Sequence, residues 1–130
     1  MRFSIPITAA AGDIDELGHV GNQVYLRWVL DVAMAHSRAK GFDLAAYQQL
    51  GLIWIVRRHE LDYLGQVKLG EALVASTWCE HWKAASVTRH TEIARGDSVV
   101  LRAQTHWVMM SLASSRPARI PDQLRASFES

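Results

Sequence analysis

Three carboxylates lie close together near the N-terminus, in a glycine-containing stretch with no helical or strand-like repeat. They are Asp13, Asp15 and Glu16. A carboxylate can attack a carbonyl carbon or activate a water molecule that does so. This stretch could therefore support the transfer or hydrolysis of an acyl group without a serine or cysteine nucleophile.

The carboxylates come directly before an expected helix that starts at or next to Asn22. From Tyr25 to Ser37, apolar residues recur at spacings of three and four, which predicts a helix, and Gly41 suits its end. The first backbone N–H groups of a helix have no partner within it and favour negative charge. Backbone amides around Asn22 could therefore hold the oxyanion that forms when a carbonyl is attacked.

A simpler interpretation assigns the same residues to local structure. Aspartate and glycine are common in turns, and asparagine is a good helix cap. On this interpretation Asp13 and Asp15 only close a turn, and Asn22 only caps the helix. The residue types alone favour this interpretation over a catalytic role.

The rest of the chain is expected to supply a sheet that packs on the helix. The expected strands are rich in Val, Ile, Thr and Trp and cover residues 3–7, 52–63, 72–82, 85–94 and 98–111. Two short helices are expected at 44–49 and 121–128. Short separators between the last four strands favour antiparallel neighbours. The prediction is an α+β fold in which the sheet curls around the helix and buries it.

The outer face of this sheet is expected to carry apolar residues, tryptophan among them. A second copy of the chain packed against that face would cover them, so an oligomer is expected.

The stretch from Asp13 to Tyr25 resembles the D-x-D-x-x-G-H-V-x-N-x-x-Y signature of the 4-hydroxybenzoyl-CoA thioesterase-like hotdog family. Further segments of the chain resemble that family in the same order: Asp62-Tyr63-Leu64, Leu69-Gly70-Glu71, Trp107-Val108 and the tail from Arg116 to Pro121. The resemblance covers nearly the whole chain. It implies the hotdog fold, with a curled antiparallel five-stranded sheet around one long central helix, as a single thioesterase domain over residues 1–130.

The resemblance also implies hydrolysis of an acyl-CoA or acyl-carrier-protein thioester to a free acid and a thiol. Asp15 would be the catalytic carboxylate, as nucleophile or general base, and the backbone amide of Asn22 would polarise the carbonyl. The substrate-binding residues would be Gly18, His19, Val20 and Tyr25. Gly21 stands where this family usually has Asn, which puts in doubt a polar contact from that side chain.

Asp31 lies within a helix that is apolar around most of its girth, and many relatives carry Glu there. A buried carboxylate needs a partner, so the favoured role is structural, with Asp31 bonding to the backbone of the Asp15 loop. The alternative is a catalytic role. Two other functions stay open: an enoyl-thioester hydratase or dehydratase of the same fold, with His19 beside the carboxylates, and a non-catalytic acyl-binding protein.

Composition limits the partners and the location. The net charge of +1 gives no indication of nucleic-acid binding, and no apolar run approaches the length of a membrane span. The single cysteine suits a reducing compartment, so a complete cytoplasmic protein is expected.

The six histidines are spread along the chain without the spacing of a metal-binding pair. His36 is expected at the helix surface or in a dimer contact rather than as a metal ligand, and no metal or other cofactor is expected beyond the coenzyme A of the substrate. Family resemblance implies a homodimer whose sheets join, with active sites at the interface, and allows a dimer of dimers.

Overall fold

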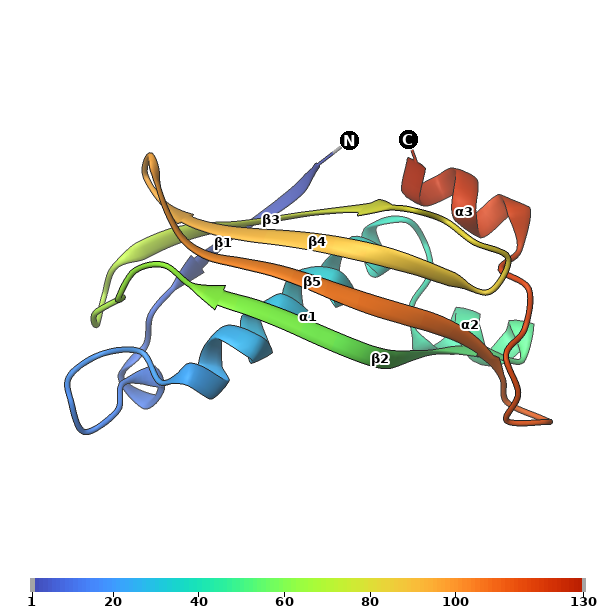
Figure 1. The fold of residues 1–130 in the computed structure, drawn as a ribbon, viewed down its shortest axis with the longest axis horizontal. Coiled ribbons are helices and arrows are strands. Elements are labelled where there is room, and N and C mark those ends of the chain that lie inside the picture. The colour runs from blue at the N-terminus through green and yellow to red at the C-terminus, as the bar shows by residue number, and fades with distance from the viewer. Residues whose placement is uncertain (1, 130) are drawn as a thin grey trace.

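An antiparallel sheet and one long helix form the two layers of the fold (Figure 1). The computed structural model describes residues 2–129. Its strands are β1 (Phe3–Thr8), β2 (Leu52–Tyr63), β3 (Ala72–Glu80), β4 (Ser86–Arg95) and β5 (Ser98–Ser111). They follow the order β1-β3-β4-β5-β2, and every neighbouring pair is antiparallel. The expected curled five-stranded sheet is confirmed.

The long helix α1 (Asn22–Ala39) packs one face against the sheet. Its inward residues Trp28, Val29 and Val32 lie in one core cluster with Ile93 and Leu101 of the sheet. Burial of this apolar face is the main driving force for the packing of the two layers.

Helix α1 is less enclosed than expected. Gln23, Arg27, Asp31, Met34 and Arg38 lie on an exposed stripe, three or four residues apart. Asp31 is therefore exposed rather than buried. Among residues 2–129, no hydrogen bond joins its side chain to the Asp15 loop. The expectation of a buried, loop-bonding Asp31 is wrong because this stripe points away from the sheet.

Two shorter helices close the end of the molecule opposite the loop that precedes α1 (Figure 1). They are α2 (Leu44–Leu50) and α3 (Asp122–Glu129). Asp43 caps α2 by accepting a hydrogen bond from the Ala46 N–H at 2.9 Å, and Gly51 ends it with a left-handed φ of +70°. Leu124 and Phe128 of α3 are buried.

The two edge strands differ. β1 is six residues long and contains Pro6, whereas β2 is twelve residues long and contains no proline. Proline lacks the N–H that strand pairing uses.

Only one tryptophan of the described sheet region, Trp78, lies with the side chains of the outer face. Trp54, Trp82 and Trp107 line a pocket that α1 also borders. Trp78, which stacks on His90 at a ring separation of 5.5 Å, lies beside polar and charged residues instead. Among residues 2–129, no helix combines the length and the apolar character that crossing a membrane requires.

Leu101 provides a test of the core. Its side chain is 0% exposed, so Leu101→Ala should lower the free energy of unfolding by about 2–5 kcal/mol. The control Leu69→Ala removes a side chain that is 61% exposed and should change stability by less than about 0.5 kcal/mol. Urea unfolding followed by circular dichroism measures both, and equal effects would contradict this assignment of the core.

Candidate active site

Asp15 lies in a tight loop between Ile14 and Val20, which form an isolated antiparallel bridge. The Asp15 N–H donates to the His19 carbonyl at 2.8 Å. Oδ1 of Asp15 accepts from the backbone N–H groups of Leu17 at 2.9 Å and His19 at 3.3 Å. Oδ2 accepts no hydrogen bond from any described residue, and the side chain is exposed. One carboxylate oxygen therefore orders the loop while the other remains open to solvent.

Gly18 makes this loop possible. Its φ of +83° is in the left-handed region, which glycine adopts at no steric cost. The simpler interpretation of Asp15 as a turn residue is thus correct as far as Oδ1 is concerned, and it leaves Oδ2 available for chemistry.

Asp13 has a different environment, although it is only two residues away. It is buried, and its Oδ1 accepts from Nη2 of Arg27 at 2.6 Å while Oδ2 accepts from the Ala10 N–H at 2.9 Å. The hydrogen bond from Arg27, followed by the one from Ala10, lowers the pKa of Asp13 below its usual value. Asp13 is therefore a charged structural group that fixes the loop to α1.

The start of α1 differs from the prediction by one residue. Gly21 is the N-cap, with φ −68° and ψ 150°, and no side chain caps the helix. The Gly21 N–H donates to the Asp13 carbonyl at 3.1 Å, which orients Gly21 and makes Asn22 the first helical residue. A cap role for the Asn22 side chain is therefore wrong. The backbone amides of Asn22 and Gln23 find no acceptor among residues 2–129.

Gly21 does not loosen this segment. A Cβ added to Gly21 would lie 3.2 Å from Oε1 of Gln23, the end of a flexible side chain that can move. The structure therefore has room for the larger residue that the family usually carries, and the hydrogen bond to Asp13 holds the glycine in place.

The predicted substrate-binding residues separate into two groups. Gly18 is exposed and His19 half-buried in the loop. Val20 and Tyr25 are buried: the Val20 N–H donates to the Val67 carbonyl at 2.8 Å, and the Tyr25 hydroxyl donates to the Gly65 carbonyl at 3.4 Å. Within one chain, Val20 and Tyr25 are therefore structural residues that connect the loop and the start of α1 to residues 65–67.

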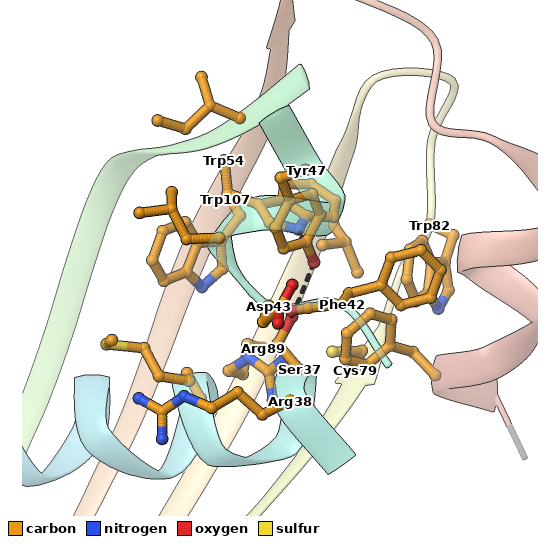
Figure 2. Close-up of a pocket in the computed structure, with 16 residues that line it drawn as sticks. Ser37, Arg38, Phe42, Asp43, Tyr47, Trp54, Cys79, Trp82, Arg89 and Trp107 are labelled. Atoms are coloured by element: carbon orange, nitrogen blue, oxygen red, sulfur yellow. Dashed lines mark hydrogen bonds between the residues drawn. The ribbon is translucent and has the colours of Figure 1, made fainter. Parts of the chain in front are cut away.

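A pocket with a volume of about 340 Å³ lies elsewhere in the described part of the chain (Figure 2). Its aromatic lining consists of Phe42, Tyr47, Trp54, Trp82, Trp107 and Phe128. On α1 it is bordered by Ala33, Met34, Ser37 and Arg38. A helix rises ~1.5 Å per residue, so the pocket is about 20 Å along α1 from the Asp15 loop.

Some polar side chains at this pocket bond to one another, whereas the indole N–H groups of Trp82 and Trp107 are buried without a hydrogen-bond partner among the described residues. The Trp54 indole N–H donates to the Tyr47 hydroxyl at 2.9 Å, and Ser37 Oγ lies 2.8 Å from that hydroxyl. Arg89, which is also part of the lining, donates from Nη1 to His36 Nδ1 at 2.9 Å. The contact between Arg89 and His36 was not predicted, because α1 and β4 are far apart in the sequence.

His36 is buried against Phe3, with ring centroids 4.9 Å apart. Its expected position at the helix surface is wrong. Burial, followed by the nearby charge of Arg89, lowers the pKa of His36 to about 4. The ring is therefore neutral at pH 7 and accepts the hydrogen bond from Arg89.

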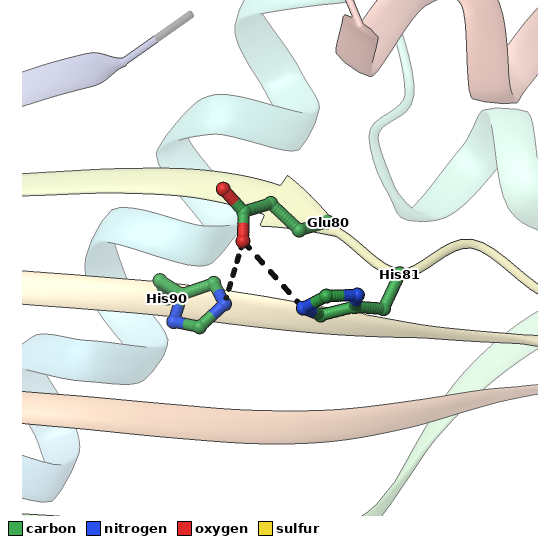
Figure 3. Close-up of side chains that lie close together, drawn as sticks. All are labelled: Glu80, His81 and His90. Atoms are coloured by element: carbon green, nitrogen blue, oxygen red, sulfur yellow. Dashed lines mark ion pairs between the residues drawn. The ribbon is translucent and has the colours of Figure 1, made fainter.

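Three potential metal ligands meet at the surface, where β3 ends beside β4 (Figure 3). Oε2 of Glu80 lies 3.3 Å from Nε2 of His90 and 3.7 Å from Nε2 of His81. Sequence spacing did not reveal the cluster, because strand pairing brings His90 opposite Trp78 and so close to Glu80. These contacts are ion pairs when the imidazoles are protonated, and we assign no metal to them.

The family model of the thioesterase-like superfamily matches residues 9–128 of this chain. The chain belongs to the thioesterase-like superfamily. This membership confirms the resemblance first seen between Asp13 and Tyr25. No curated protein sequence matches the chain.

Solved structures agree with membership of the thioesterase-like superfamily. Slr0204, a 1,4-dihydroxy-2-naphthoyl-CoA thioesterase from Synechocystis, has 18% identity and a TM-score of 0.91, covering 100% of this chain and 97% of its own. A probable thioesterase from Bartonella henselae has 19% identity and a TM-score of 0.86, covering 93% and 100%. SAV2348 from Staphylococcus aureus, solved in complex with CoA, has 14% identity and a TM-score of 0.93, covering 99% and 82%. At these identities the similarity establishes the hotdog fold.

Asp13 provides a test of how the loop is held. Asp13→Asn removes the ion pair with Arg27 and should lower the free energy of unfolding at pH 7 by about 1–3 kcal/mol. A carboxyl whose pKa is lowered by folding stabilises above its unfolded pKa of about 3.9 and loses that contribution as the pH falls through the folded value. The difference between wild type and variant should therefore shrink from pH 5 towards pH 3 in urea unfolding experiments.

Asp31→Asn is the matched control for this test, because Asp31 is exposed on the same helix as Arg27. It should change stability by less than about 0.5 kcal/mol at either pH. A loss in Asp13→Asn that is independent of pH would contradict the ionic explanation.

Proposed function

We propose that this protein hydrolyses the thioester of an acyl-CoA or acyl-carrier-protein substrate, with Asp15 as the catalytic carboxylate. The observation that carries the proposal is the open Oδ2 of Asp15, held in a loop that leads directly into a helix with free N-terminal amides. Membership of the thioesterase-like superfamily supports the reaction class. The CoA complex of SAV2348 supports a substrate that carries coenzyme A.

The proposed chemistry uses only the protein and water. Asp15 attacks the thioester carbonyl or deprotonates a water molecule that attacks it, and the amides of Asn22 and Gln23 stabilise the oxyanion. The C–S bond breaks with release of the thiol, which is a good leaving group and needs no strong general acid. Water supplies the oxygen and hydrogen of the free acid and thiol, so no cofactor beyond the coenzyme A of the substrate is required.

We further propose that two copies join through their β2 strands. Near its C-terminal end, β2 approaches the start of α1, where the Tyr63 hydroxyl lies 3.4 Å from the Asn22 carbonyl. Near its N-terminal end, Ile53 and Trp54 line the pocket. An antiparallel two-fold pair of β2 strands places the two ends side by side. The Asp15 loop of one copy would then face the pocket of the other, which gives the acyl group a place to bind.

Exposed apolar side chains along this side support the same pairing. Met34 and Ile55 are about half exposed in the single chain, and Leu44 is 66% exposed. A contact through β2 would cover them. We therefore propose a homodimer, which could assemble further into a dimer of dimers. We also propose a cytoplasmic location and no nucleic-acid or membrane partner.

Asp15→Asn tests the catalytic role. Asparagine keeps the Oδ1 acceptor for the two loop N–H groups, so the fold should survive, but it cannot serve as a base or as an anionic nucleophile. The kcat for thiol release from a panel of short, medium, long and aromatic acyl-CoAs should fall by about 100-fold or more. Glu16→Gln, a change to the neighbouring exposed carboxylate, should leave kcat within about threefold of wild type.

Other results of the same assays would contradict the proposal. Unchanged hydrolysis in Asp15→Asn removes Asp15 from the mechanism. Loss of enoyl absorbance from an enoyl-CoA without thiol release indicates the hydratase or dehydratase alternative. Binding of acyl-CoAs without any thiol release indicates an acyl-binding protein.

Ile55→Lys tests the pairing through β2. A lysine at this half-exposed apolar position would bury an unpaired charge in the proposed contact, so the variant should sediment as a monomer and lose most of its thiol release. Val74→Lys, at a similarly exposed position on β3, should remain paired and active. A dimeric and active Ile55→Lys protein would contradict this arrangement.

A further inference from the structure

Arg89 is the buried cation of a pocket lined mainly by apolar side chains, whereas the other charged lining residues, Arg38 and Asp43, are exposed. Arg89 is 6% exposed, and it lines the pocket together with the aromatic side chains of Trp54, Trp82 and Trp107 (Figure 2). No acidic side chain of residues 2–129 forms an ion pair with it. The one carboxylate in the lining, Asp43, accepts from the Ala46 N–H at the start of α2 instead.

The groups that do contact Arg89 carry no negative charge. Nη1 donates to His36 Nδ1 at 2.9 Å and to Thr77 Oγ1 at 3.0 Å. His36 is neutral at pH 7, because burial lowers its pKa to about 4. The Phe128 ring lies 5.6 Å from the guanidinium carbon and offers only the weak attraction of a π face.

A buried charge without a counter-charge is unfavourable unless something else compensates it. Arginine has five N–H donors, and only one of its nitrogens has partners here. The remaining donors form a planar fork that matches the two oxygens of a carboxylate. The unpaired side chain therefore indicates a ligand that brings an anionic oxygen into the pocket.

The shape and lining of the pocket define the rest of that ligand. A volume of about 340 Å³ is at the lower end of small-molecule sites and corresponds to roughly eleven water molecules of ~30 Å³. Aromatic and aliphatic side chains together form most of the lining, which favours an alkyl or aryl body. The ligand class is thus an apolar group that ends in a carboxylate.

We propose that this pocket binds a small amphiphilic carboxylate, with its alkyl or aryl body among the tryptophans and its carboxylate on the free N–H groups of Arg89. Such a carboxylate can be the far end of an acyl group that enters on a thioester, or it can be a free acid. The binding itself depends neither on Asp15 nor on hydrolysis.

Matched ligands test the proposal directly. Octanoate and octanamide have the same alkyl chain and differ in charge, and both are transparent where tryptophan fluoresces. Their Kd values are measured by titrating the tryptophan fluorescence of the full chain at pH 7 and low salt. Octanoate should bind at least tenfold more tightly than octanamide. In Arg89→Met, which keeps the length of the side chain without its charge, this preference should disappear.

Arg116→Met is the control, because Arg116 is exposed and lies outside the pocket. It should keep the full preference for octanoate. Equal affinities for octanoate and octanamide in the wild type, or a preference that persists in Arg89→Met, would overturn the proposal. If Arg89→Met does not fold, the Kd values of octanoate and octanamide for the wild type still test the proposal. Arg89→Lys, which keeps the positive charge, should retain the preference for octanoate.

The source of the carboxylate is resolved by adding octanoate to a thiol-release assay. A rise in KM at constant kcat assigns the pocket to the acyl group of the substrate. An unchanged KM at saturating octanoate assigns it to a free carboxylate. If the protein releases no thiol at all, the proposed hydrolysis is wrong. The Kd values of octanoate and octanamide still test the carboxylate site, because that measurement does not depend on hydrolysis.

Discussion

Burial of one face of α1 against a curled sheet determines where everything else in this protein can lie. The helix is straight and long enough to span the sheet, so its two ends are far apart. Its N-terminal end leaves two amides free beside the Asp15 loop, and its C-terminal half borders the aromatic pocket. The Asp15 loop and the aromatic pocket therefore lie at opposite ends of α1 within one chain.

Electrostatics distinguishes side chains that the sequence presents as equivalent. Asp13 and Asp15 are separated by one residue, yet Asp13 is buried against Arg27 and Asp15 is exposed. The first gives the loop a fixed position relative to α1, which leaves the second free to keep an open oxygen. At the other end of the helix, burial keeps His36 neutral and leaves the Arg89 charge uncompensated. The carboxylate of Asp15 therefore lies near the N-terminal end of α1, and the guanidinium of Arg89 lies near its C-terminal half.

Sequence periodicity predicted the elements well, because apolar spacing directly reflects which face packs. Strand β4 was expected at 85–94 and spans Ser86–Arg95, and α2 was expected at 44–49 and spans Leu44–Leu50. The cap of α1 was misplaced because Gly21 and Asn22 are both acceptable caps, and a hydrogen bond to Asp13 selects the glycine. The exposure of Asp31 was readable in principle from its spacing to Arg27 and Gln23. The contact between His36 and Arg89 joins positions 53 residues apart and leaves no local pattern.

The contrast between the two edge strands has a consequence for assembly. In the proposed dimer the sheet would pair through the long, proline-free edge of β2, and the edges left open would be the short β1 strands, each of which contains Pro6. Proline cannot donate to a further strand, so growth by edge pairing stops after one addition. The fold thereby permits a closed particle and disfavours the open-ended stacking of sheets that leads to fibres.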